Sequence, residues 1–137
     1  MRFMISVAHG IKIFVCTEPA DMRRSFDGLS GMVETVVKQD PLSGHLFLFR
    51  NRNRDRLKIL YWDRDGLAIW YKRLEEGTFQ FPTDLKEQRE ALKKRPQSGV
   101  EITAADLSLL LGGIDLSQIH RRKRFERKQS ELPAKPR

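Results

Sequence analysis

The sequence predicts an α+β fold, in which an antiparallel β-meander of four to five strands packs against one long and one short helix. Between residues 46 and 81, short apolar runs alternate with clusters of turn-forming residues, which is typical of consecutive hairpins. On either side of this region, apolar residues recur at spacings of three and four, which is typical of amphipathic helices. The chain has 137 residues, of which 39% are hydrophobic, enough for one domain with a modest core.

A strand and a long helix are predicted before the meander. Residues 11–16 alternate Ile and Val with other residues, which favours a strand. The apolar residues between 21 and 39 fall on one helical stripe, and Asp21 is the expected N-cap. Gly28 and Gly31 lie inside this helix, where each costs about 1 kcal/mol relative to Ala. We therefore expect another backbone to pack closely against them.

Three turns divide the meander into four strands. They are predicted at residues 51–55, 63–66 and 75–77, where Asn, Asp and Gly cluster. Gly66 and Gly77 close the second and third turns, where a positive φ is usually required. The four strands are then expected at Leu46–Phe49, Leu57–Trp62, Leu67–Leu74 and Thr78–Phe81.

A short helix is predicted after the meander, from about Thr103 to Leu111, with Thr103 and Asp106 forming a capping box. We expect one domain over residues 1–116, with a charged insert at about 84–100. Residues 117–137 are expected to form a basic flexible tail. The predicted core consists of apolar residues from both helices and the central strands: Phe26, Leu29, Val33, Val36, Leu57, Ile59, Ile69, Leu107 and Leu110.

A run of five cations at every second position, from Arg50 to Lys58, is the most distinctive charge pattern. Because the predicted turn at 51–55 interrupts the run, we expect a hairpin tip fringed with arginines. Lys72 and Arg73 follow on a neighbouring strand, with Trp62, Trp70 and Tyr71 interleaved. Such cations can meet phosphates while aromatic rings stack on bases, although strand aromatics are usually core and charged tips are usually solvated.

The formal net charge is +8, and most of the excess lies near the C-terminus. Residues 120–137 contain eight Lys or Arg against two Glu. This segment can pair with phosphates, or it can be a solvated terminus without a specific partner. The predicted nucleic-acid-binding residues belong to the hairpin and to this tail: Arg50, Arg52, Arg54, Arg56, Lys58, Lys72, Arg73, Arg121, Arg122, Lys123 and Arg124.

The acidic residues of the turns give little support for a metal-dependent active site. Asp55, Asp63 and Asp65 are the candidate metal ligands. However, Asp63 and Asp65 flank a predicted turn, and turn chemistry accounts for both without a metal. We therefore expect no metal and no strand-cutting chemistry.

The other reactive side chains are equally uninformative. His9, His45 and His120 are scattered, without a Ser or Cys partner suggested by spacing. Cys16 is the single cysteine, which excludes an internal disulfide, and it is expected to be a small buried strand residue. The sequence contains no Gly-rich phosphate-binding loop. We expect a protein that is not an enzyme and that takes no cofactor and no small-molecule substrate.

The apolar runs are too short for a membrane span or a signal peptide, so we expect a cytoplasmic protein of bacterial type with no membrane partner.

Three stretches carry a resemblance to a known family: DMRRSFDGL at 21–29, residues 40–79, and LSLLLGGID at 107–115. Over about residues 11–116, apart from the insert, the chain resembles the small accessory protein called TnpB in bacterial insertion elements of IS family sixty-six. The resemblance implies a protein encoded beside the transposase and needed for efficient transposition, with no strand-cutting activity of its own. The implied partners are the transposase and other proteins of the same element.

The chain departs from this family in the insert and in the basic tail. A larger RNA-guided nuclease shares the family's name, but this chain is too short for it and lacks zinc-ribbon cysteines. Two functional hypotheses remain. The protein binds element DNA within the transposition complex, or it is an adaptor that binds the transposase or its small companion without touching DNA.

Overall fold

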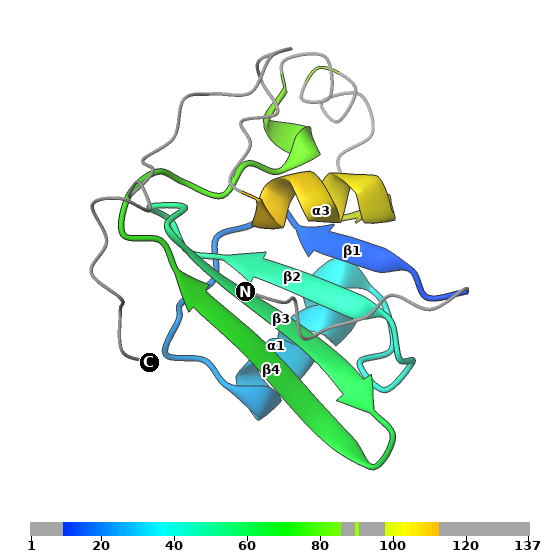
Figure 1. The fold of residues 1–137 in the computed structure, drawn as a ribbon. Helices are drawn as coiled ribbons and strands as arrows, with labels where there is room; N and C mark the ends of the chain where they lie inside the picture. The colour runs from blue at the N-terminus through cyan, green and yellow to red at the C-terminus, as the bar shows by residue number, and fades with distance from the viewer. Residues whose placement is uncertain (1–9, 86–89, 91–97, 113–137) are drawn as a thin grey trace, which may run out of the picture.

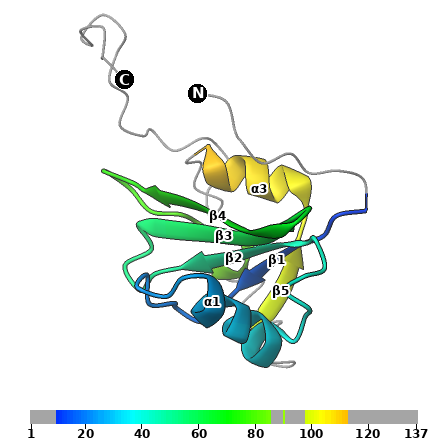
Figure 2. The same ribbon diagram turned by 90° about the horizontal axis from the view of Figure 1, so that it is seen from below.

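The computed structural model describes residues 10–85, 90 and 98–112, which form one five-stranded sheet with a helix on each face (Figures 1 and 2). The strand order is β4-β3-β2-β1-β5. Figure 2 shows the sheet nearly edge-on, with α3 on one side and α1 on the other. The predicted α+β class is therefore confirmed. The elements are β1 (Ile13–Cys16), α1 (Phe26–Met32), the π-helix η1 (Val33–Val37), β2 (Leu46–Arg50), β3 (Arg56–Asp63), β4 (Gly66–Arg73), the 3-10 helix η2 (Pro82–Asp84), β5 (Gly99–Ile102) and α3 (Ala104–Leu111).

The meander is confirmed for three strands, because β2, β3 and β4 pair antiparallel in sequence order. The fourth predicted strand, at residues 78–81, is wrong. Phe79 and Phe81 are buried in the core cluster under α3, so this segment covers one face of the sheet rather than extending it. The strand that completes the sheet is β5, which the sequence analysis did not predict and which pairs antiparallel with β1.

The core forms two clusters, one on each face of the sheet. The cluster under α3 contains Leu57, Ile59, Leu107 and Leu110, as predicted. The cluster under α1 and η1 contains Leu29 and Val33, also as predicted, while Val36 and Ile69 pack against it partly buried. Phe26 was wrongly assigned to the core, because it is 44% exposed at the start of α1.

The first helix begins five residues later than predicted, and Asp21 is not its N-cap. The Asp21 carboxylate accepts a hydrogen bond from the backbone N–H of Arg23 at 2.9 Å, which makes a separate turn. The carbonyls of Met22 and Arg24 accept hydrogen bonds from the Lys58 ammonium instead of joining a helix. The N-cap is Ser25, and α1 with η1 spans residues 26–37.

The close backbone packing expected at two helical glycines occurs at another glycine. A Cβ on Gly31 would meet nothing within 4 Å, and one on Gly28 would meet only the Arg24 side chain. A Cβ on Gly99, in contrast, would lie 2.6 Å from Cγ1 and 2.9 Å from Cα of Val37. Only glycine lets the edge strand β5 approach the end of η1 this closely.

Local signals identified the turns and the last helix. The Thr103 hydroxyl accepts from the N–H of Asp106 at 3.0 Å, and the Asp106 carboxylate accepts from the N–H of Thr103 at 3.1 Å, which confirms the capping box. The turn between β3 and β4 is confirmed, but its positive φ belongs to Arg64 (63°) rather than to Gly66. Gly77 has the expected positive φ of 86°.

Candidate nucleic-acid interface

The tip between β2 and β3 is a tight loop held by its own side chains. The carbonyl of Asn51 accepts from the N–H of Arg54 at 3.0 Å. The Asn51 side chain bridges the loop: its Oδ1 accepts from the N–H of Arg56 at 3.0 Å, and its Nδ2 donates to the Asp55 carboxylate at 2.7 Å. The turn residues of the sequence pattern therefore close the loop, and the arginines between them are left to point outward.

A second segment braces this tip from the side. The N–H of Leu74, just after β4, donates to the carbonyl of Asp55 at 2.8 Å. The N–H of buried Phe79 donates to the carbonyl of Arg54 at 2.7 Å. These bonds satisfy backbone groups that a free hairpin tip would leave to water, so the tip is a fixed part of the fold.

Arg50 is not a surface cation, in contrast to the prediction. It is 7% exposed, and its guanidinium forms a bidentate ion pair with Asp84 at 2.7 and 3.0 Å. It also donates to the carbonyl of Phe79 at 2.9 Å and lies 4.0 Å from the centroid of the Phe81 ring. Arg50 therefore holds the 79–84 segment against the sheet and is not available to a phosphate.

Burial alone would raise the pKa of Asp84, but the hydrogen bonds and charge of Arg50 outweigh burial and lower the pKa below its ordinary value. The carboxylate also accepts from the N–H of Phe81 at 2.9 Å. Asp84 is therefore charged at neutral pH, as an ion pair with Arg50 requires.

Lys58 is also buried, at 8% exposure. Its ammonium donates to the carbonyls of Met22 and Arg24 at 2.9 and 2.8 Å, and it lies 4.8 Å from the centroid of the Tyr71 ring. The side chain thus joins β3 to the segment before α1. The expectation that Arg50 and Lys58 belong to an exposed basic fringe is wrong, because both are used inside the protein.

The three central cations of the run do lie at the tip. Arg52 and Arg54 are exposed and Arg56 is half-buried. Arg54 lies 3.6 Å from Asp84, a weak contact, and Arg56 donates to the Tyr71 hydroxyl at 3.4 Å. The structure records no side-chain partner for Arg52 among the described residues.

Two further predicted cations lie beside this tip. Arg73 is paired with Arg56 across the β3–β4 ladder, and Lys72 is paired with Leu57. Both are exposed, and Arg73 also forms an exposed ion pair with Glu75 at 3.0 Å. Because like charges on paired strands repel, the Arg56–Arg73 pair favours binding of an anion at this end of the hairpin. The basic tip is defined here as Arg52, Arg54, Arg56, Lys72 and Arg73.

The aromatic residues that lie among these cations leave little ring surface exposed for stacking on bases. Trp62 and Trp70 are half-buried, and Trp70 packs against the core cluster under α3. Tyr71 is 47% exposed, but its ring lies over Lys58 and its hydroxyl accepts from Arg56. The expected stacking platform is therefore reduced to Tyr71.

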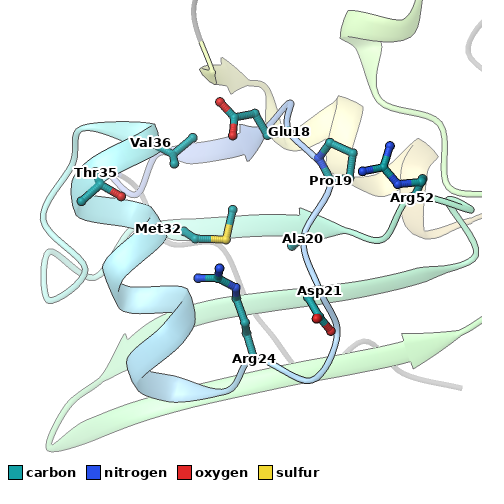
Figure 3. A pocket seen from close by; sticks show the side chains of 9 residues that line it. All are labelled: Glu18, Pro19, Ala20, Asp21, Arg24, Met32, Thr35, Val36 and Arg52. Atoms are coloured by element: carbon teal, nitrogen blue, oxygen red, sulfur yellow. The ribbon is translucent and has the colours of Figure 1, made fainter.

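A cavity of about 570 Å³ opens beside the tip, between η1 and the 18–21 segment (Figure 3). Sequence reasoning missed it, because three separate segments form its walls. Met32 and Val36 give it an apolar side, and Arg24 and Arg52 contribute guanidinium groups. Its acidic residues are already engaged: Glu18 accepts from Ser98, and hydrogen bonds from Arg23 lower the pKa of Asp21 to about 2.

The charge of the described residues differs from that of the whole chain. Residues 10–85, 90 and 98–112 contain 12 Lys or Arg and 14 Asp or Glu, a formal charge of −2. Since the whole chain carries +8, the other residues carry +10. The predicted tail cations Arg121, Arg122, Lys123 and Arg124 lie outside the described residues. Residues 1–116 as a whole contain 18 Lys or Arg and 16 Asp or Glu, a formal charge of +2, so the basic tip is a local cluster on a nearly neutral domain.

The candidate metal ligands do not come together. Asp55 precedes β3, whereas Asp63 and Asp65 lie at its other end, roughly 25 Å away along an extended strand. Among the described residues, no three His, Cys, Asp or Glu side chains are placed to hold a metal ion.

His45 and Cys16 have structural surroundings. The Nδ1 atom of His45 accepts from the N–H of Lys12 at 3.0 Å. Burial raises the pKa of the Cys16 thiol, which donates to the carbonyl of Glu18. Cys16 is buried in β1, as predicted. His9 and His120 lie outside the described residues.

Comparison with known proteins shows where the chain belongs. Its sequence matches the family described as IS66 Orf2-like protein over residues 11–121. The chain is a member of this family. Two relatives come from Sinorhizobium fredii, and both are called uncharacterized. The protein y4jC is 36% identical over 119 residues, which cover 87% of this chain and 92% of the relative. The protein y4hO is 33% identical over 112 residues, which cover 82% of this chain and 88% of the relative. No solved structure matches.

Membership of the IS66 Orf2-like family confirms the resemblance to the accessory protein of these insertion elements. The matched range contains the sheet, both helices and the basic tip, and it ends before Arg122. The three tail cations from Arg122 to Arg124 thus lie beyond the part that the family shares. In the described part of the chain, no helix is long and apolar enough to span a membrane.

Proposed function

We propose that this protein is a non-catalytic accessory protein of an IS66-type insertion element, acting in the bacterial cytoplasm by binding element DNA within the transposition complex. The observation that supports DNA binding is the basic tip. Arg52 and Arg54 project from a loop that backbone hydrogen bonds fix in place, and Arg56, half-buried, lies beside them at the start of β3. Because the loop backbone is already ordered, contact with phosphates has to order only the arginine side chains, so the tip can contribute affinity despite its small size.

The tail, residues 120–137, supplies +6 of the net charge of +8. In this proposal it provides non-specific attraction to the DNA backbone, and the tip fixes where the folded domain lies on the duplex. The cations available for DNA are then Arg52, Arg54, Arg56, Lys72 and Arg73 in the tip and Arg121, Arg122, Lys123 and Arg124 in the tail. Arg50 and Lys58 are removed from the interface.

The experiment is a titration of duplex DNA with the full chain, and with a chain ending at Ile119, at several salt concentrations. The logarithm of affinity falls with the logarithm of salt concentration at about 0.9 per phosphate neutralised. We expect a steep dependence for the full chain and a slope lower by several units for the shortened chain. Absence of salt-dependent binding to single- or double-stranded DNA would reject the proposal.

The alternative is an adaptor that binds the transposase or its small companion. The observation in its favour is the nearly neutral charge of residues 1–116, which is only +2, together with a cavity that has both apolar and cationic walls. A domain with so small a net charge is not strongly attracted to DNA as a whole. Capture of the transposase by the tagged protein, unchanged by nuclease treatment, would favour this function over DNA binding.

A further inference from the structure

The two edges of the sheet differ in length and in protection. At one edge, β5 has only four residues. At the other edge, β4 has eight, and its pairing with β3 runs without a bulge from Arg56↔Arg73 to Asp63↔Gly66. In the described part of the chain, β4 pairs with β3 alone and forms the outer margin of the sheet (Figure 1). Its outer side therefore presents a row of backbone N–H and C=O groups.

Proteins usually protect such an edge by a short strand, a proline, a bulge or a central charge. The β4 strand, of sequence GLAIWYKR, has none of these. Its centre, from Leu67 to Tyr71, is apolar, and its cations Lys72 and Arg73 lie at the C-terminal end. The strand is thus suited to accept another strand along most of its length.

The charge distribution along β4 indicates which strand it accepts. An acidic residue, Asp65, immediately precedes the strand, and a basic residue, Arg73, ends it. When two copies pair antiparallel, Arg73 of each copy, which already forms an exposed ion pair with Glu75, lies beside Asp65 of the other. Parallel pairing would instead bring Lys72 and Arg73 beside their own copies, where like charges repel.

We propose that β4 pairs antiparallel with β4 of a second copy of this chain, so that two sheets join across a two-fold axis. In an antiparallel ladder, two opposed residues either both direct their backbone N–H and C=O groups toward the other strand or both direct them away. Because this direction alternates along β4, the two opposed residues must both have odd numbers or both have even numbers. With Ile69 on the axis, Arg73 of each copy lies opposite Asp65 of the other. Tyr71 then faces Leu67, and bulky Trp70 faces small Ala68. Such a closed, isologous contact is the commonest arrangement of homo-oligomers.

This inference and the DNA-binding proposal both use Arg73, but they can fail separately because self-association is measured without DNA. A single strand edge is a small interface, so the dimer is expected to be weak and must be measured at protein concentrations up to about 200 μM. The first measurement is sedimentation velocity of the full wild-type chain without DNA. We expect a concentration-dependent dimer, and hydrogen exchange of the β4 amides that slows as the concentration rises.

Charge reversal then tests the register. The single variants Asp65→Lys and Arg73→Glu each place two repulsive pairs in the dimer, and we expect each to weaken self-association roughly tenfold. An equimolar mixture of the two variants restores both pairs in a heterodimer, so its association should return to the wild-type level. Glu34→Lys and Lys38→Glu are matched controls, because they make the same charge changes at exposed positions outside β4 and should leave the dimer unchanged.

A wild-type chain that remains monomeric, with β4 exchange independent of concentration, would overturn the proposal. So would a dimer that both single variants form as well as the wild type, because the contact would then use another surface. Failure of the mixture to restore association would reject the register with Ile69 on the axis.

Discussion

Two groups of cations occur in the same alternating run and have opposite environments. Arg50 and Lys58, at its two ends, are buried and bind carboxylate or carbonyl oxygens of other segments. Arg52 and Arg54, between them, are exposed at a turn. The spacing is the same in both groups, so spacing alone does not distinguish a structural cation from one available to a ligand. The difference is whether another segment brings an oxygen to the side chain.

The largest effect is expected from removing Arg50. Arg50→Met leaves the Asp84 carboxylate buried without its partner, and breaking a buried ion pair in this way costs about 3–5 kcal/mol. Chemical denaturation should show a loss of this size in the free energy of unfolding. Adding Asp84→Asn to the same chain should recover a large part of it, since no buried charge remains. An Arg50→Met protein as stable as the wild type would mean that the pair is solvated.

Removing Lys58 should have a smaller effect. Lys58→Met leaves the carbonyls of Met22 and Arg24 without their donor, and because Met22 is half-buried and Arg24 exposed, water can replace part of what is lost, for a total cost of about 1–3 kcal/mol. The free energy of unfolding should decrease by an amount in that range in the variant, and the 21–25 segment should become more susceptible to proteolysis. A loss no greater than that of an exposed control, Lys38→Met, would contradict the structural role.

The Asp84 ion pair also predicts how stability depends on pH. The pKa of Asp84 is lower in the folded protein than its ordinary value of 3.8, so the unfolded chain binds its proton first as pH falls. The stabilisation is therefore complete above the ordinary pKa and is lost as pH falls through the folded pKa. Denaturation midpoints measured from pH 6 to pH 2 should decline below about pH 4, and less steeply in Asp84→Asn than in the wild type. Equal slopes would exclude Asp84 as a source of the decline.

At the other end of β3, a substitution is expected to increase the free energy of unfolding, by a smaller amount than the losses above. Arg64 adopts a φ of 63° in the two-residue turn, a conformation that costs a non-glycine residue roughly 1 kcal/mol. Arg64→Gly should therefore raise the free energy of unfolding by up to about 1 kcal/mol. Arg64→Ala is the matched control, because it removes the side chain without relieving the backbone, and it should give no gain.

Local sequence signals predicted the parts of the fold that depend on neighbouring residues. The turn at 63–66 and the capping box of Thr103 and Asp106 each depend only on residues within a span of four. Contacts between distant segments were not predictable. Asp84 lies 34 residues after Arg50, and the carbonyl of Met22 lies 36 residues before Lys58, so a local pattern could not reveal that either cation is buried.

The cavity and β5 were missed for the same reason. The cavity is assembled from the 18–24 segment, the helix and the tip, and no one of these carries a recognisable motif. The strand β5 is only four residues long, and its glycine is explained by the approach of Val37 rather than by a turn. One signal was available but ambiguous: Gly99 could mark either a loop or a close contact, and only the fold decides between them.

In the proposed function, the exposed cations of the run bind DNA while the buried ones hold the fold, so the salt dependence of DNA affinity distinguishes the two groups. The tip variant Arg52→Gln, Arg54→Gln, Arg56→Gln should melt at the wild-type temperature and lower the slope of affinity against salt by about 2–3. The control Lys12→Gln, Lys38→Gln, Arg64→Gln removes three exposed cations from other segments, and its slope should change by less than about 1. Equal slopes for the tip variant, the control and the wild type would contradict the claim.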